Sequence, residues 1–345
     1  MIRCYIPGFK RPSKEENRYG DTQVLTDGKY TLVIDGMCGT GATKLITWLK
    51  KNKKQKVWLL ITHWHDDHFV GIEKILNDSY FKPQMLICPN PTWLDPGLKG
   101  PAAKTVQACI NDGNRIVALA KKKKIPVKFP VSGSAYKFGE LKFKLYKQLP
   151  KQPYSDDPHA WGFVNDGSIS AFFPEYGYWT SGDGCGISDQ KDRIRHLGLA
   201  GKIKFFKIDH HGGYCTESNA QFFKQQGADF CWYNDLEPNG VGTEEFTQFG
   251  ARRCKQADIH VFESVGDINW IAKDKKVVIY KDFKSYSYDC AYKGKATLKG
   301  ASRKVANDVI AGKYGSDNER ITNLLDAGYY PIAVQKLVNK ILKEE

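Results

Sequence analysis

The feature that most constrains this chain is a group of imidazole and carboxylate side chains directly after an apolar strand. Val57–Ile61 is a continuous apolar run, typical of a buried strand, and the chain continues as Thr62-His63-Trp64-His65-Asp66-Asp67-His68. Functional side chains are commonly placed where strands end in loops. Three His and two Asp within six residues put much polar surface beside the core, and binding a metal ion would account for it. The sequence therefore predicts a metal site here.

The spacing of this cluster divides it into two sets of ligands. His63 and His65 occupy alternate positions of an extended chain, so their side chains point the same way and can meet one ion. Asp67 and His68 begin a helical turn and are expected to face a second ion nearby. The alternative, surface histidines that happen to be adjacent, does not explain why the buried strand leads straight into them. We expect all four side chains to be ligands.

Three further motifs end predicted strands in a chain that reads as strands interleaved with helices, an α/β arrangement. They are Leu32-Val33-Ile34-Asp35-Gly36, Ser181-Gly182-Asp183 and Asp209-His210-His211-Gly212. Together with the first cluster they resemble the metallo-β-lactamase-fold hydrolases, in the competence-protein-like and phosphodiesterase branch. The resemblance implies an αββα sandwich with one or two metal ions at its strand edge. We expect a hydrolase domain at 1–283, a linker at 284–302 and a helical unit at 303–345.

The same resemblance implies roles for the later motifs. Asp35 corresponds to an early structural aspartate, and Asp183 to the carboxylate that bridges two metals. One of His210 and His211 is expected to be a ligand. Similar proteins carry a tyrosine where His211 stands, which favours His210 as the ligand and leaves His211 to contact substrate or to act in catalysis. The other ring nitrogen of a ligating imidazole needs its own partner, for which Asp209 or a backbone carbonyl is available.

The middle histidine of this family has one candidate in the sequence. Only His159 lies between the first motif and Asp183, so we expect it to complete the first metal site. The alternative is that His159 belongs to a substrate loop and that Asn165 lies nearer the metal. His196, in a basic helix, and His260, on a buried strand, are interpreted as structural.

Such a site predicts hydrolysis without a protein nucleophile. Two divalent ions about 3.5–4 Å apart hold a bridging hydroxide, lower its pKa and clamp an in-line displacement. Nitrogen ligands with one bridging carboxylate suit Zn²⁺ best, with Mn²⁺ or Fe as alternatives. Asp67 would ligate one metal and orient the hydroxide, and His211 or a water would protonate the leaving group. Three aromatic residues near the motifs are candidates to line a substrate cleft, with packing in the core as the alternative: Trp64, Trp93 and Tyr214.

The C-terminal unit at 303–345 has its own sequence pattern. The segments Gly312-Lys313-Tyr314-Gly315, Ala327-Gly328-Tyr329 and Ala333-Val334-Gln335-Lys336 occur in an order that resembles the cell-wall-binding repeat of the Cpl-7 lysozyme type. The resemblance implies a three-helix unit that contacts muropeptide through Arg320, Gly328 and Tyr329. The family tends to have Asp where this chain has Tyr330. The alternative is an ordinary helical cap on the hydrolase domain, because the apolar residues have helical core spacing.

The charge of the chain points to an anionic partner. Its 52 Lys and Arg against 38 Asp and Glu give a net charge of +14. The unit at 303–345 carries seven basic and six acidic residues, so nearly all of the excess belongs to the hydrolase domain. Phosphorylated wall polymers and nucleic acid both fit such a surface, and binding to nucleic acid would weaken steeply with salt.

The cysteines and the N-terminal residues bear on localisation. Nine scattered cysteines form no C-x-x-C pair, which argues against a zinc ribbon or a redox dithiol. There is no apolar signal region near the start and no run of about 20 apolar residues for a bilayer span. We expect a protein, of phage or bacterial origin, that is made in the cytosol and acts at the cell wall after release or lysis, without a membrane partner.

These observations favour one function over two alternatives. The leading hypothesis is a metal-dependent phosphodiesterase or esterase that acts on an anionic wall polymer such as a teichoic acid, with the C-terminal repeat docked on peptidoglycan. The first alternative is a nuclease resembling the hydrolase domain of competence proteins. The second is a non-catalytic wall-binding protein with a degenerate metal site.

Overall fold

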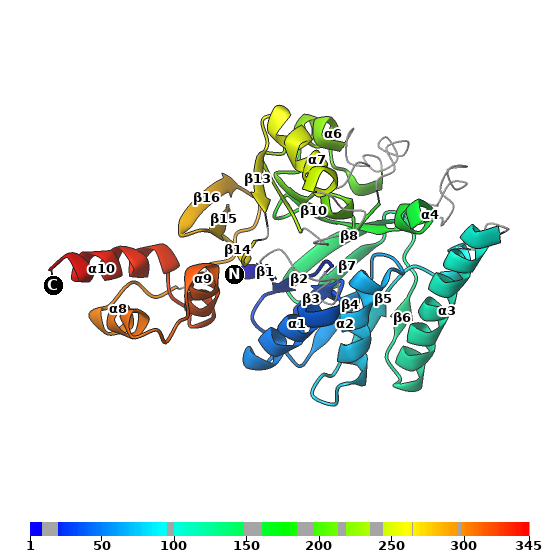
Figure 1. The fold of residues 1–345 in the computed structure, drawn as a ribbon, viewed down its shortest axis with the longest axis horizontal. Coiled ribbons are helices and arrows are strands. Elements are labelled where there is room, and N and C mark those ends of the chain that lie inside the picture. Colours follow the sequence, from blue (N-terminus) through cyan, green and yellow to red (C-terminus); the bar gives the residue numbers. More distant parts are fainter. Residues whose placement is uncertain are drawn as a thin grey trace.

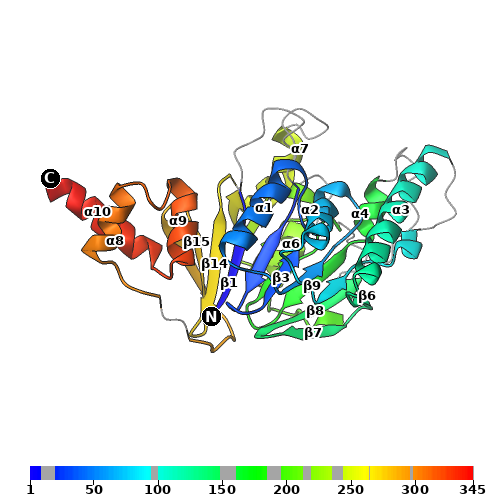
Figure 2. The same cartoon turned by 90° about the horizontal axis from the view of Figure 1, so that it is seen from below.

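Two β-sheets packed face to face, with helices on both outer faces, form the body of the molecule (Figure 1). The computed structural model describes residues 1–8, 20–94, 100–147, 161–184, 196–212, 219–234, 244–263, 265–295 and 298–344. Three helices at the C-terminal end of the chain form a separate unit beside one edge of the first sheet (Figures 1 and 2).

The first sheet has nine strands among the described residues, in the order β16-β15-β14-β1-β2-β3-β4-β5-β6. Strands β3 to β6 run parallel to one another, and the remaining neighbours are antiparallel. Their bounds are β1 (Ile2–Ile6), β2 (Gln23–Thr26), β3 (Thr31–Ile34), β4 (Val57–Leu60), β5 (Met85–Ile87), β6 (Val127–Lys128), β14 (Ile268–Lys273), β15 (Lys276–Lys281) and β16 (Lys284–Asp289).

The second sheet has seven strands over the described ranges, in the order β13-β12-β11-β10-β9-β8-β7. Strands β10 to β13 are parallel and β7 to β10 antiparallel. The bounds are β7 (Ala135–Phe138), β8 (Leu141–Lys147), β9 (Ile169–Phe173), β10 (Tyr178–Thr180), β11 (Phe205–Lys207), β12 (Phe230–Tyr233) and β13 (His260–Glu263).

Helices cover the outer face of each sheet and produce three apolar layers. Between the sheets lies one core of large side chains, among them Leu60, Phe143, Phe173, Phe205 and Trp270. A second core lies under α1 (Gly39–Lys51), α2 (Asp66–Asn77) and α3 (Gly100–Lys122), and a third under α6 (Asn219–Gln225) and α7 (Glu244–Gln256). Short helical segments are η2 (Pro91–Leu94), α4 (Trp161–Asp166) and η4 (His210–Gly212). The predicted αββα sandwich is confirmed.

The C-terminal unit consists of α8 (Arg303–Ile310), α9 (Asp317–Asp326) and α10 (Pro331–Glu344). Ser302 caps α8 by accepting a hydrogen bond from the backbone N–H of Val305. The helices enclose a small core of their own, made of Val305, Ala306, Val309, Leu324, Val334, Val338 and Ile341. Figure 2 shows α9 beside β14 and β15, where Ile321 and Leu325 pack on Ile271 and Tyr280.

The structure differs from the expected linker at 284–302. Residues 284–289 form strand β16, which pairs with β15 along its length. Tyr286 and Tyr288 are the inward residues of this strand and pack against Phe230 of the second sheet. The alternation of Tyr with Ser, Lys and Asp is the two-residue period of a strand, whereas the composition resembles that of a linker. In the part of the chain that the structure describes, no helix has the length and apolar character that a membrane span requires.

Candidate metal centre

The first cluster lies at the carboxyl end of β4, where the chain turns into α2. His65 is the residue before the helix, and Asp66 and Asp67 occupy its first turn, where carboxylates favour the helix dipole. His63, Asp67 and His68 are buried, at 1%, 4% and 0% exposure. The imidazoles of His63 and His65 approach to 3.1 Å between Nε2 and Nδ1. Four of the predicted ligands are thus brought together by one strand end.

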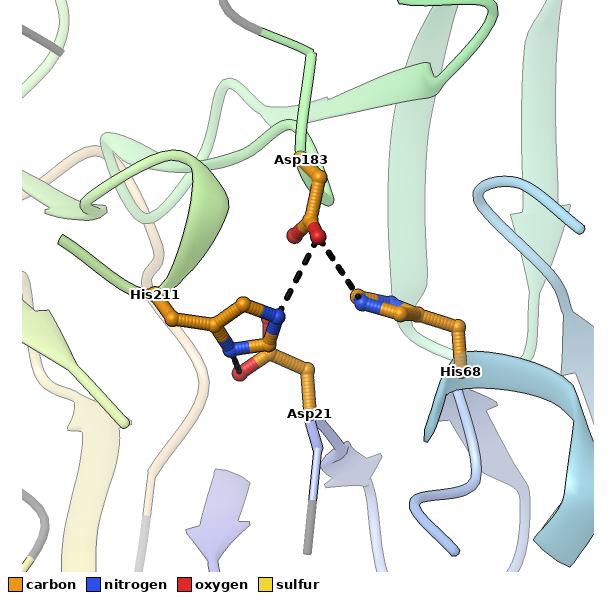
Figure 3. A group of neighbouring side chains, drawn as sticks. All are labelled: Asp21, His68, Asp183 and His211. Atoms are coloured by element: carbon orange, nitrogen blue, oxygen red, sulfur yellow. Dashed lines mark ion pairs between the residues drawn. The ribbon is translucent and has the colours of Figure 1, made fainter. Parts of the chain in front are cut away.

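One carboxylate oxygen of Asp183 is the point on which three imidazoles converge. Its Oδ2 lies 3.1 Å from Nε2 of His211, 3.3 Å from Nε2 of His68 and 3.7 Å from Nε2 of His63. Figure 3 shows His68 and His211 pointing at Asp183 from opposite sides. The close approach depends on Gly182, because a Cβ there would lie 2.3 Å from Oγ1 of Thr62.

The ligand atoms fall into two groups that share Asp183. One group is His63, His65 and Asp183, and the other is Asp21, His68, Asp183 and His211; within each, the ligand atoms lie within 4.8 Å of one another. Oδ2 of Asp67 lies beside the second group, 3.3 Å from Nε2 of His211 and 3.5 Å from Nε2 of His68. Imidazole nitrogens and carboxylate oxygens in this arrangement are compatible with divalent metal ions.

Asp35 supports this cluster through contacts with Thr62 and His68. It lies directly after β3, and its Oδ1 accepts a hydrogen bond of 2.8 Å from the backbone N–H of Thr62. Its Oδ2 accepts one of 2.8 Å from the Thr62 hydroxyl and lies 2.9 Å from Nδ1 of His68. A carboxylate on Nδ1 directs Nε2 of His68 toward the ligand site. The predicted structural role of Asp35 therefore has a defined contact.

Two buried residues of the site were missed by the sequence interpretation. Asp21 precedes β2, Lys207 ends β11, and both are 0% exposed. Nζ of Lys207 lies 2.6 Å from Oδ2 of Asp21 and 3.6 Å from Oδ1 of Asp183. A lysine inside the apolar run Phe205-Phe206-Lys207-Ile208 is a signal that was available, since a buried lysine requires a partner. Nothing in the local sequence marks Asp21.

The electrostatics of the site separate its imidazoles into two kinds. Burial lowers the pKa of His63 well below its usual value and that of His65 to about 4, so both are neutral near pH 7. Burial also opposes the charged form of His68 and His211, but Asp183 and the neighbouring carboxylates raise the pKa of both well above the usual value.

The carboxylates respond in the opposite direction. Burial alone would raise the pKa of Asp67 and Asp183, but the imidazoles of His68 and His211 hold the pKa of both below the usual value. The carboxylates are therefore ionised near pH 7. Positive charge already gathers around these oxygens without a metal, and a divalent cation would replace it.

The choice between His210 and His211 is the main departure from the sequence interpretation. His211 belongs to the second ligand group, whereas His210 belongs to neither. Both residues adopt left-handed backbone angles, with φ of 45° and 53°. This conformation ends the alternation of side-chain directions that β11 has, and it turns the His211 side chain into the cluster. The ring centroids of His210 and His211 are 6.0 Å apart. The partner on Nδ1 of His211 is Asp21, at 3.5 Å, instead of Asp209.

The expected cleft residues are only partly described. His159 and Tyr214 lie outside the described residues, as does the side chain of Trp93, which belongs to η2. Trp64 does not line a cleft, because it is 1% exposed and packs in the core against Phe69. Its position between two ligands in sequence places it on the opposite, core-facing side of the chain, as alternation requires.

His260 and His196, the histidines interpreted as structural, and Asn165, the alternative ligand, were also located. His260 packs against Phe262 and Tyr286 of the sheets, and His196 lies 6.1 Å from the ring of Tyr146. Asn165 is buried near the end of α4, and within the described part of the chain no group hydrogen-bonds to its Oδ1.

The residues expected to contact the wall belong to α9 and to the turn that follows it. Arg320 donates to the carbonyl of Gly315 and to Oε1 of Gln335, both at 3.0 Å, and its guanidinium lies over Phe283. Gly328 has a φ of 79° and ends the turn after α9. Tyr329 lies under the ammonium of Lys299, 5.5 Å from the ring centre. Their role in binding stays a prediction.

Comparison with known proteins agrees with both parts of the chain. Residues 18–107 match the metallo-beta-lactamase superfamily, and residues 303–342 match the CW_7 repeat. A curated relative is the lysozyme of Streptococcus phage Cp-7, 37% identical over 90 residues, which are 25% of this chain and 25% of that lysozyme. The chain therefore carries a metallo-beta-lactamase domain followed by a CW_7 repeat, and both predicted resemblances are confirmed.

Similar solved structures include two of different origin. The metallo-beta-lactamase fold protein YhfI from Bacillus subtilis is 11% identical with a TM-score of 0.48, over 79% of this chain and 100% of that chain. Unliganded yeast PDE1 is 9% identical with a TM-score of 0.47, over 76% of this chain and 98% of that chain.

Proposed function

We propose that the protein is a metal-dependent hydrolase that cleaves a phosphodiester or related ester bond in an anionic cell-wall polymer. Its C-terminal repeat would hold it on peptidoglycan. The observation that carries the proposal is the convergence of His63, His68 and His211 on one oxygen of Asp183, all of them buried. The neutral imidazole of His63 and the ionised carboxylate of Asp183 could bind a divalent cation directly, whereas binding to His68 and His211 would displace the protons that their raised pKa values favour.

The donor set supports two divalent ions, with zinc as the expected metal. His63 and His65 would hold one ion, together with His159 by resemblance. His68, His211 and Asp67 would hold the other, and Asp183 would lie between them. Two such ions would supply Lewis-acid stabilisation of both the attacking and the leaving oxygen.

The side chains around the ions would orient the reactants. Oδ2 of Asp67, near both imidazoles of the second group, is suited to accept a proton from an attacking water and to aim that water at the substrate. Because Nε2 of His211 faces Asp183, His210 is the better candidate of the pair to contact the leaving group. This assignment exchanges the roles expected from the sequence.

The net charge of the chain supports an anionic substrate. A phosphodiester-linked wall polymer matches both the +14 balance and the presence of a CW_7 repeat in the same chain. A binding unit that concentrates the enzyme on its polymer raises the effective substrate concentration without new contacts at the active site.

A panel of substrates tests the chemistry. The zinc-loaded protein is assayed against bis-p-nitrophenyl phosphate, a choline phosphate ester, wall teichoic acid, DNA and a β-lactam, with Asp67→Ala as the inactive control. We expect turnover of the phosphodiesters and the wall polymer. Preferred cleavage of DNA would support the nuclease instead, and turnover of the lactam alone would refute the proposal. Absence of bound metal in the purified protein would favour a non-catalytic wall-binding protein.

A sedimentation assay tests the wall contact. The full chain is incubated with purified peptidoglycan, and the bound fraction is compared with that of Tyr329→Ala. Tyr329 is half-buried and packs at the edge of the unit's core, so thermal unfolding is used to check that the variant is folded. We expect the variant to bind less while its hydrolysis of a small phosphodiester is unchanged. Equal binding by the variant would place the contact elsewhere on the protein.

A further inference from the structure

A buried lysine beside the metal centre is held by two backbone carbonyls and one carboxylate. Nζ of Lys207 lies 2.6 Å from Oδ2 of Asp21 and donates to the carbonyls of Gly182, at 2.7 Å, and Ile208, at 3.2 Å. The two carbonyl contacts are hydrogen bonds, and the contact with Asp21 is an ion pair. Lys207 therefore connects the end of β11 to the Gly182 turn and to the segment that carries Asp21.

The backbone around Asp21 is fixed against the first cluster. The N–H of Asp21 donates to the carbonyl of Asp67 at 3.2 Å, and its own carbonyl accepts from Met37 at 3.0 Å. The preceding residue must be glycine, because a Cβ at Gly20 would lie 1.9 Å from the Asp67 carbonyl oxygen. Asn234 donates to the Gly20 carbonyl at 2.6 Å. Such close backbone contacts leave the Asp21 carboxylate little freedom to move.

The second oxygen of Asp21 faces His211 on the side away from the ligand site. Oδ1 lies 3.5 Å from Nδ1 of His211, while Nε2 of the same ring lies 3.1 Å from Oδ2 of Asp183 (Figure 3). A carboxylate on Nδ1 favours the tautomer with its proton there, which leaves the Nε2 lone pair for a metal. Asp21 faces the same ring nitrogen of His211 that Asp35 contacts on His68, at 3.5 Å in place of the hydrogen-bonding distance of 2.9 Å.

The two oxygens of Asp183, the carboxylate shared by both ligand groups, have different neighbours. Its ammonium lies 3.6 Å from Oδ1 of Asp183, whereas the three imidazoles approach Oδ2. A divalent ion held by Asp21 would lie close to this ammonium and be repelled by it. Asp21 is therefore better placed to orient His211 than to bind the ion itself.

We propose that Asp21 and Lys207 are positioning residues of the second metal site, which hold Nε2 of His211 and Oδ2 of Asp183 toward the ion. The proposal rests on the metal centre of the proposed function and is independent of the substrate. It assigns Lys207 no part in the reaction itself, because its ammonium is fully buried and is held by groups of the protein.

Metal affinity is the direct test. Zinc stoichiometry and chelator-competition affinities are measured for the full chain and for Asp21→Asn. We expect one of two ions to bind about 10- to 100-fold more weakly, as is typical when the partner of a ligating histidine is lost, with the other ion unchanged. Asp35→Asn should weaken the same ion. If Asp21→Asn binds both ions as tightly as the unaltered protein does, the proposal is overturned. If the unaltered protein itself binds no zinc, the proposed function is overturned.

A spectroscopic measurement separates positioning from direct ligation. With ¹⁵N-labelled histidine and zinc bound, Nδ1–H of His211 should give a protected proton signal, assigned by its loss in His211→Ala. We expect Asp21→Asn to remove this protection. Cobalt bound to Asp21→Asn should keep the coordination number that it has in the unaltered protein. The intensity of the visible absorption of the bound cobalt measures that number. A change of coordination number at the second site would make Asp21 a ligand and contradict the proposal.

Lys207→Met and Lys204→Met form a matched pair for the role of the ammonium. Lys204 precedes the same strand but is partly exposed and pairs with Asp229 at 3.5 Å. We expect Lys207→Met to weaken the second ion and Lys204→Met to leave both unchanged. The thermal unfolding of each metal-free variant shows whether it is folded. If Lys207→Met is folded and binds both ions normally, Lys207 has no positioning role.

Discussion

Two buried polar networks in this molecule differ in how their donors and acceptors are paired. Where the C-terminal unit meets the first sheet, donors face acceptors. Arg3 pairs with Asp326 and donates to Oδ1 of Asn269 at 2.9 Å, and Asn269 donates to the hydroxyl of Thr322 at 2.9 Å. That hydroxyl donates in turn to Oδ2 of Asp267 at 2.8 Å. The cationic and anionic groups of this network therefore satisfy one another.

The metal centre, in contrast, contains ligand atoms with no hydrogen-bond partner among the described residues, among them Nε2 of His68 and both ring nitrogens of His211. Three carboxylates and several imidazoles lie within a few ångströms of one another, and Lys207 is a single fixed ammonium among them. Burying unpaired charge is costly, so such a cluster persists when a cation completes it. A polar network whose members hydrogen-bond to one another supports the fold, whereas a buried one whose nitrogen atoms lack such partners indicates a ligand.

The largest expected effect follows from removing the shared acceptor. Asp183→Asn should lower the affinity for both ions, because Asp183 is the one member common to both ligand groups. Hydrolysis should fall to background, and metal analysis should find less than one ion per chain. The matched variant Asp326→Asn, in the interface network, should keep its full metal content. Two ions retained in Asp183→Asn would show that the two groups are not joined through this carboxylate.

The two adjacent histidines give the next effect. His211→Ala should lose one ion, since Nε2 of His211 lies 3.1 Å from Asp183. His210→Ala should retain both ions but turn over substrate about 10²- to 10⁴-fold more slowly, the usual contribution of a general acid. Metal stoichiometry and kcat are measured on both variants. The reverse pattern, with metal lost in His210→Ala, would support the assignment made from the sequence.

This pair also shows where sequence reasoning ends. The first cluster was predictable because its members are near neighbours in sequence and follow one apolar strand, so local geometry alone brings them together. The choice between His210 and His211 depends on two left-handed residues, which no pattern of residue types specifies. Asp21 and Lys207 come from different sheets and meet only through the packing of those sheets. Strand β16 was hidden because its composition resembles a linker.

The interface network predicts a loss of stability without loss of metal. Asp326→Ala leaves the Arg3 guanidinium, 9% exposed at its side chain, without its carboxylate. Removing one member of a buried ion pair costs about 3–5 kcal/mol, which denaturant unfolding measures. Arg303→Ala is the control, because its pair with Glu344 is exposed at 74% and 51%. A change within about 0.5 kcal/mol is expected there. An equal loss in both variants would mean that burial does not distinguish these pairs.

The smallest expected effect is a change in how stability depends on pH. The carboxylates raise the pKa of His68 and His211 well above the usual value. In the metal-free protein this stabilisation is complete below about pH 6.5, the ordinary pKa of histidine. It is lost as the pH rises through the higher folded values. The lowered pKa values of His63 and His65 affect stability only below about pH 6.5, where unfolded histidine gains its proton.

The metal-loaded protein should show the opposite trend over the same range. Protons and metal ions compete for the same nitrogens, so metal binding strengthens as the pH rises. Melting temperatures between pH 6.5 and 9 should therefore fall in chelator and rise or stay level with saturating zinc. The interface variant Asp326→Ala should keep both slopes, because its network contains none of these histidines. If the melting temperature depended on pH in the same way with and without zinc, the ion would not replace the protons of His68 and His211.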